Sequence, residues 1–151
     1  MIPAESIWFD TLSHLRDIVI AYVLALPLGW DREKEERSAG LRTFPLVAIA
    51  SCGFALLGTS VLGKGSMAQG YVLQGLIVGI GFIGAGAIIK RPGETYGTAT
   101  AACLWITGAV GAAVGFGLYD IAIMLSVAAF FTLRTLAPFK KGTRNEEEEE
   151  L

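Results

Sequence analysis

Four long apolar runs constrain this chain more than any other feature of its sequence. They cover residues 43–62, 71–89, 98–116 and 118–136, and their only charged residues are Asp120 and Arg134, near the two ends of the last run. A helix needs about 20 mostly apolar residues to cross the roughly 30 Å hydrocarbon core of a bilayer. Each run therefore predicts a membrane-spanning helix.

The segment before these runs is harder to interpret. Residues 18–30 are apolar, but they would give only about 20 Å of helix. The segment reaches a full span only by extending back towards Ile7, through several polar and charged residues. We predict an all-α membrane helix bundle with five transmembrane helices. In a four-span alternative, residues 10–17 would instead lie on the cytoplasmic surface of the membrane.

Composition agrees with a membrane bundle. Hydrophobic residues make up 53% of the 151 and charged residues only 17%, whereas soluble domains carry about 25% charged residues. The net charge of −2 includes the acidic run 146–150, and nothing in the sequence resembles a nucleic-acid-binding surface. We expect residues 1–139 to form the transmembrane domain and residues 140–151 to be a disordered, charged tail. Cys52 and Cys103 fall inside spans, where free cysteines behave as small hydrophobic residues.

The distribution of basic residues predicts how the bundle is oriented. With five spans, Arg16 and Lys64 lie on one side of the membrane, and the other ten of the twelve Lys and Arg residues lie on the opposite side. Basic loops stay in the cytoplasm. The N-terminus is therefore expected outside and the C-terminus in the cytoplasm.

Glycine patterns in the spans resemble nucleotide-binding motifs but stand in the wrong context. Residues 79–84 spell G-x-G-x-x-G within an apolar run, without the strand that a dinucleotide site requires. Residues 58–64 approach a P-loop, but Gly65 replaces the Ser or Thr that would bind magnesium. We interpret the glycines as helix-packing positions. On the third predicted helix we expect two glycine faces and a central place in the bundle; the packing glycines of the third and fourth helices are Gly75, Gly79, Gly81, Gly84, Gly86, Gly108, Gly111 and Gly115.

Four motifs in order give a more specific signal. They read G-W-D-R-E at residues 29–33, A-G-L-R-T at 39–43, G-I-G-F-I-G-A-G at 79–86 and T-A-T-A-A-C-L-W at 98–105. Over residues 15–136 this order resembles the MgtC/SapB family of bacterial membrane proteins. Asp31 stands where that family usually has Glu. The chain looks like the membrane-only, SapB-like kind that lacks the C-terminal ACT-like domain of the magnesium-responsive members.

The resemblance implies a multi-pass protein of the bacterial cytoplasmic (inner) membrane that acts in magnesium-linked stress adaptation. We expect it to associate through its helices with itself or with a membrane partner such as the F-type ATP synthase. The alternative is a Mg²⁺ transporter or channel. No acidic residue lies near the middle of the four apolar runs, which favours association over ion conduction. With a single His and no paired nucleophile, we do not expect an enzyme.

The family's charged motif supplies the first candidate site. Its residues are expected at the cytoplasmic helix ends, where Arg42 could pair with Asp31, Glu33 or Glu94. This group would be either an ion-paired collar that fixes the helix ends or a recognition or ion-binding surface at the cytoplasmic face. It comprises Asp31, Arg32, Glu33, Arg42, Thr43 and Glu94, with Lys90 and Arg91 beside them.

A second candidate site lies near the N-terminus. Asp10, Ser13, His14 and Asp17 share one face of a helix at 100° per residue. Asp10, His14 and Asp17 could bind a divalent cation, although magnesium prefers oxygen ligands and His14 argues against it. The alternative is an amphipathic turn at the membrane surface, with Arg16 neutralising a neighbouring acid. We expect no cofactor, and Mg²⁺ binding stays open.

Overall fold

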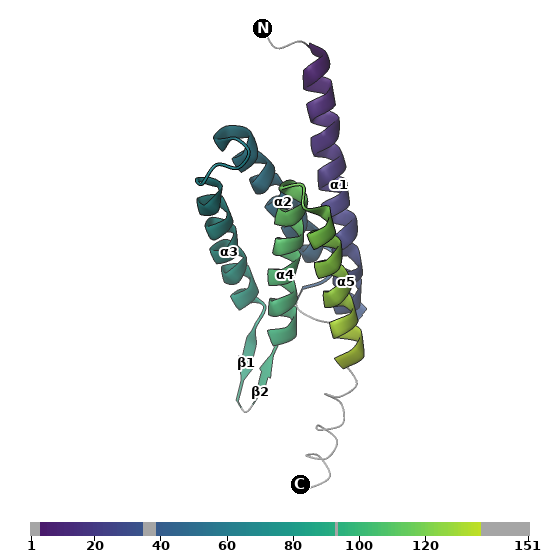
Figure 1. Cartoon of the computed structure of the whole chain (residues 1–151). Helices are drawn as coiled ribbons and strands as arrows, with labels where there is room; N and C mark the ends of the chain where they lie inside the picture. Colours follow the sequence, from purple (N-terminus) through teal and green to yellow (C-terminus); the bar gives the residue numbers. More distant parts are fainter. Residues whose placement is uncertain (1–3, 35–38, 93, 137–151) are drawn as a thin grey trace, which may run out of the picture.

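A computed structural model describes residues 4–34, 39–92 and 94–136 of the chain. Its described part is a helix bundle with one short hairpin (Figure 1). The elements, in order, are α1 (Ala4–Lys34), α2 (Thr43–Leu62), α3 (Gln69–Gly86), β1 (Ile89–Arg91), β2 (Glu94–Tyr96), α4 (Thr98–Gly115) and α5 (Tyr119–Leu136). The predicted tail at residues 140–151 lies outside the described residues.

The five described helices are all long and apolar enough to cross a membrane. The prediction of five spans is therefore confirmed. The first helix does extend back through the polar residues, and α1 is 31 residues long. Its N-terminal part projects beyond the ends of the other helices (Figure 1). The outer surface of the bundle carries apolar side chains, such as Val61 and Phe82, which are 78% and 83% exposed. Such a surface suits contact with lipid rather than with water.

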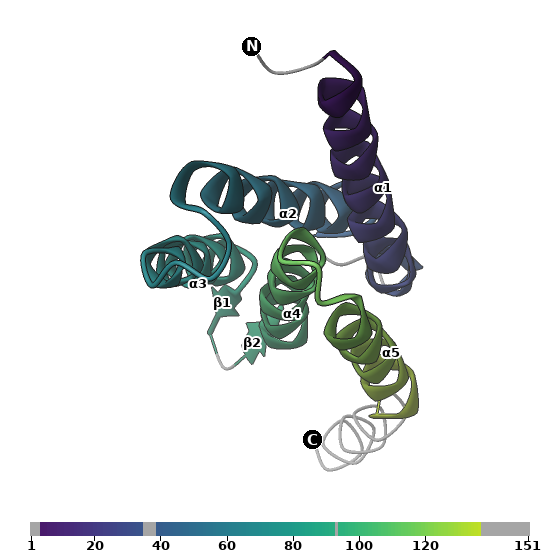
Figure 2. The same cartoon turned by 45° about the horizontal axis from the view of Figure 1, so that its top comes forward.

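The central helix is α4, not α3 as we predicted from the two glycine faces. α4 contacts each of the other four helices and lies between α2, α3 and α5 (Figure 2). In its span 61% of the residues are buried, against 11% in α3. α3 packs mainly against α2 and α4 and leaves its other face open. Glycines on two faces permit two neighbours, but they do not require them.

Small residues give α4 its central place. A Cβ added at Gly111 would overlap the backbone carbonyl of Ala48, and one at Gly115 would lie 2.6 Å from the carbonyl oxygen of Cys52. The α2 and α4 backbones therefore touch. Between membrane helices, where lipid is as apolar as the side chains, such close van der Waals contact is the main source of attraction.

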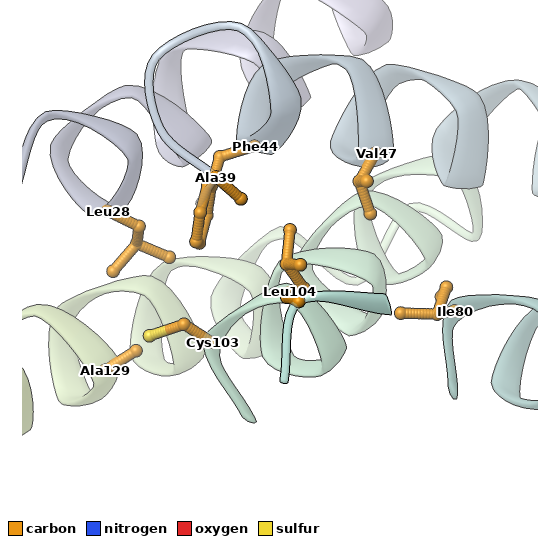
Figure 3. Packing of buried hydrophobic residues seen from close by; sticks show 9 residues of the cluster. Leu28, Ala39, Phe44, Val47, Ile80, Cys103, Leu104 and Ala129 are labelled. Atoms are coloured by element: carbon orange, nitrogen blue, oxygen red, sulfur yellow. The ribbon is translucent and has the colours of Figure 1, made fainter. Parts of the chain in front are cut away.

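Two apolar clusters fill the bundle. One joins Leu28 and Phe44 to Val47, Ile80 and Leu104, with Cys103 and Ala129 beside them (Figure 3). The other is built of smaller residues along α1, α2, α4 and α5: Ala21, Ala25, Ala48, Cys52, Val110, Ala113, Val114 and Ala122. Both cysteines are buried and free, in agreement with their interpretation as small hydrophobic residues.

The hairpin between α3 and α4 is a feature that we did not predict. β1 and β2 pair antiparallel, with Ile89 opposite Tyr96 and Arg91 opposite Glu94. Gly97 follows with a positive φ of 85°, and a Cβ there would overlap the carbonyl oxygen of Ala87. Glycine is required at this junction because other residues rarely adopt that conformation. We call the end of the bundle that carries the hairpin and the α1–α2 connection the hairpin end, and the other the loop end.

Candidate functional site

At the hairpin end, the first two motifs pack on each other. The carboxylate of Glu33 accepts a hydrogen bond from the backbone N–H of Leu41, at 3.0 Å. A Cβ at Gly40 would overlap that carboxylate, and one at Gly29 would lie 3.2 Å from Cα of Leu41. The carbonyl of Gly40 then accepts the N–H groups of Thr43 and Phe44, which starts α2. The two glycines and Glu33 therefore hold the end of α1 against the start of α2.

Arg32 is the most deeply buried charged residue at this end. It is 3% exposed, and its guanidinium donates to Oδ2 of Asp31 through Nη2 at 2.5 Å and Nε at 3.2 Å. A buried charge is tolerated when it is paired, so the neighbouring Asp31 allows Arg32 to be buried near the end of α1.

Arg42 is exposed, and within the described part of the chain it forms no ion pair with Asp31, Glu33 or Glu94. The suggested pairing was therefore wrong. The reason is geometric: Asp31 pairs with Arg32 and Glu33 binds the backbone of Leu41. Arg42 is left as a solvent-facing cation, and Thr43 is the half-buried first residue of α2.

The hairpin adds a second charged surface at the same end. Lys90 and Arg91 are exposed. The Arg91 guanidinium lies 5.9 Å from the centre of the Tyr96 ring, and the Tyr96 hydroxyl donates to Glu94. Tyr96 thus bridges the two charged residues that face each other across the hairpin.

At the loop end, Asp17 is the residue of the second candidate site that the fold buries. It is 7% exposed. Its Oδ1 accepts hydrogen bonds from Arg16 Nε and Nη2, at 2.9 and 2.8 Å, and from the hydroxyl of Tyr119 at 2.8 Å. Arg16 Nη2 also donates to the Tyr119 oxygen, at 2.7 Å. The expectation that Arg16 neutralises a neighbouring acid is confirmed, and the cluster joins α1 to α5.

The remaining residues of the second candidate site do not join Asp17. Asp10 and His14 are exposed, and the Ser13 hydroxyl donates to the backbone carbonyl of Asp10. Among residues 4–34, 39–92 and 94–136, no three His, Cys, Asp or Glu side chains come together in a way that could hold a metal ion. The structure does not assemble the suggested Asp10–His14–Asp17 cation site, because Asp17 turns into the helix contact.

Tyr119 is a residue that sequence reasoning missed. The signal was available: five spans place the start of α5 and the first half of α1 on the same side of the membrane, so a tyrosine there can meet an acid on α1. Ser126 was missed as well. Its hydroxyl donates to the Leu24 carbonyl at 2.7 Å, one turn before Pro27 in α1.

The predicted packing glycines fall into two groups. Gly108, Gly111 and Gly115 lie against Ile80, Ala48 and Cys52, and a Cβ at Gly84 would lie 3.3 Å from the Ala101 carbonyl oxygen. At the other four positions a Cβ would meet nothing within 4 Å in the described chain: Gly75, Gly79, Gly81 and Gly86. A packing role for these four stays a prediction.

Comparison with known proteins assigns this arrangement to a family. The profile of the MgtC family matches residues 18–142, which include both the α1–α2 junction and the packed glycines of α4. The chain belongs to the MgtC family. The resemblance of the four motifs is thereby confirmed.

The chain is similar to SrpB of Synechococcus elongatus, which is 36% identical over 84% of this chain and 75% of its own length. The putative magnesium transporter YhiD of Escherichia coli K12 is 30% identical over 82% of this chain and 60% of its own. MgtC of Brucella abortus is 38% identical over 71% of this chain and 44% of its own. The chain thus spans less than two thirds of the last two relatives. No solved structure matches it.

Proposed function

We propose that this member of the MgtC family acts by helix-mediated association with another membrane protein, in adaptation to magnesium limitation. The F-type ATP synthase is the partner that we propose for test. The family and the printed names of its relatives support the link to magnesium. We place the protein in the bacterial cytoplasmic membrane, with the hairpin end in the cytoplasm.

The observation that carries the proposal is the contact between α2 and α4. At Gly111 and Gly115 the backbones of the two helices touch, so main chain and small side chains fill the space between α2 and α4. A conducting pathway needs polar groups that replace the hydration shell of the ion. This close packing supports a role in which the outer faces of the helices bind another membrane protein.

Several buried polar groups support the same role. The hydroxyls of Thr107 and Ser126 donate hydrogen bonds to the backbone carbonyls of Cys103 and Leu24. In the described part of the chain, the two buried charged residues lie towards opposite ends of the bundle: Asp17 binds Arg16 and Tyr119, and Arg32 binds Asp31. We also propose that the chain is not an enzyme, since His14, its single histidine, is exposed.

Magnesium transport is the second candidate, because one relative carries the name putative magnesium transporter. A transporter would have to open a path that this conformation closes. Among the described residues, Asp17 towards the loop end and Asp31 at the hairpin end are the acids that are buried or half-buried, so they are the candidates to line such a path.

The two candidates are separated by purifying the tagged full chain from native membranes grown at low and high magnesium. Association predicts that a defined membrane complex co-purifies, more strongly at low magnesium. Arg42→Ala should weaken this capture, since Arg42 is an exposed cation of the family motif, and Lys64→Ala at the other end is the matched control. Both variants must reach the membrane at parental abundance.

The same protein reconstituted in liposomes should give no magnesium flux above empty vesicles. Saturable uptake that Asp17→Asn or Asp31→Asn abolishes would overturn the proposal in favour of transport.

A further inference from the structure

The face of α3 that points away from the bundle carries an unusual polar side chain. Gln74 lies in the candidate span Gln69–Gly86 and is exposed. Its position is about 7 Å along the helix from the first residue. Within the described chain its amide takes part in no hydrogen bond. An amide that faces lipid without a partner is unfavourable, and membrane helices commonly satisfy it across a helix–helix contact.

Small residues flank Gln74 along the same face. Gly70 precedes it by one turn, and Gly81 and Ala85 follow it at helical spacing; all three are exposed, and a Cβ at either glycine would meet nothing within 4 Å. Val78 and Phe82 stand beside this line and are 67% and 83% exposed. A second helix could therefore approach closely, guided by two protruding side chains.

Next to this face, α2 and α3 enclose an apolar groove of about 390 Å³. Gly75 and Gly79 line it on α3, and Phe54 and Ser51 line it on α2. Ser51 is 1% exposed, and no hydrogen bond of its hydroxyl exists among the described residues. The groove therefore holds a second unmet polar group within the span.

We propose that this face of α3, together with the groove, is the contact between two copies of this chain. A twofold contact uses the same patch on both copies, so the patch must be complementary to itself. The Gln74 amide offers a donor and an acceptor and can meet Gln74 of the other copy. The patch also holds both a protrusion, Phe82, and a hollow, the groove, so each copy can fill the other.

The polar amide of Gln74 indicates which molecule covers this face of α3 and its groove. A lipid acyl chain could fill the groove, but it offers no partner to the Gln74 amide. A second copy satisfies the amide and fills the groove at once. This inference does not rest on the proposed function, because a dimer is compatible with association and with transport alike.

The test measures dimerisation of the full chain in vesicles of phosphatidylethanolamine and phosphatidylglycerol, by energy transfer between labelled copies as the protein is diluted into lipid. Gln74→Leu should weaken the dimer about tenfold, and Gln74→Asn, which keeps an amide, should weaken it less. Gly79→Leu should fill the groove and abolish dimerisation. Met124→Leu is the matched control and should change nothing, since Met124 lies on α5 and is 61% exposed.

Disulfide cross-linking gives an independent readout that does not depend on a folded variant of Gly79. Val78→Cys should cross-link two copies, whereas Met124→Cys should not. A protein that stays monomeric at all lipid ratios would overturn the proposal. So would a dimer that is insensitive to Gln74→Leu, or a monomer that retains a tightly bound lipid which Gly79→Leu releases.

Discussion

The hydroxyl of Tyr119 lies 2.8 Å from the carboxylate of Asp17, and this hydrogen bond joins residues that are 102 positions apart. It fixes the loop end of α5 against α1. Further along the two helices, the hydrogen bond from Ser126 to the Leu24 carbonyl also joins α5 to α1. Asp17 is tolerated in a membrane helix because Arg16 and Tyr119 supply its donors.

Replacing the Tyr119 hydroxyl should therefore loosen the α1–α5 contact. We expect Tyr119→Phe to lower the stability of the bundle by about 1 kcal/mol, because one hydrogen bond to a carboxylate is lost. Thermal unfolding in detergent measures this. Tyr71→Phe is the control, since Tyr71 is 77% exposed and its hydroxyl makes no hydrogen bond among the described residues. Equal unfolding temperatures for Tyr119→Phe and the parent would contradict the structural role.

The two groups of glycines should respond differently to a large side chain. Gly111→Leu should destabilise the bundle by about 3 kcal/mol or more, because its Cβ already overlaps the backbone of Ala48. Gly79→Leu should change the stability of the single chain by less than about 0.5 kcal/mol, because nothing lies within 4 Å of the new Cβ. Comparable losses for both variants in the thermal unfolding of monomeric protein would show that α3 is packed more tightly than the structure has it.

The junction between the two motifs should behave as one unit. We expect Glu33→Ala and Gly40→Ala each to cost about 1 kcal/mol, since either change removes the bond from the Leu41 N–H to the Glu33 carboxylate. The double variant should lose clearly less than the two single losses together, because the Cβ at position 40 then has no carboxylate to displace. A double-mutant cycle on thermal unfolding measures the coupling, and strictly additive losses would argue against it.

Orientation in the membrane is a prediction that the arrangement of basic residues supports. A cysteine introduced at Lys64 should react with a membrane-impermeant thiol reagent in intact cells, whereas one at Lys90 should react only after the cells are opened. The native Cys52 and Cys103 are buried and serve as an internal background. Labelling of position 90 from outside would show that the orientation is the reverse of the predicted one and that the charged motif lies outside the cytoplasm.

Hydropathy predicted most of the fold because crossing a membrane is a property of each segment alone. The span at residues 43–62 coincides with α2, and the last two predicted spans differ from α4 and α5 by one residue. The third span was shifted: α3 ends at Gly86, and Ile89 belongs to a hairpin. An apolar window cannot distinguish the last turn of a helix from a short strand at its end.

By itself, the sequence determined the number of spans, the bounds of three of them to within one residue, and the four motifs of the family. Only the tertiary structure decided that α4 is central, that Asp17 meets Tyr119, and that Asp31 pairs with Arg32 and leaves Arg42 exposed. The physical reason is that burial in lipid depends on roughly 20 consecutive residues. Packing depends instead on which helix surfaces fit each other. A glycine shows that a close approach is feasible, whereas the shape of the neighbouring helix decides whether that approach occurs.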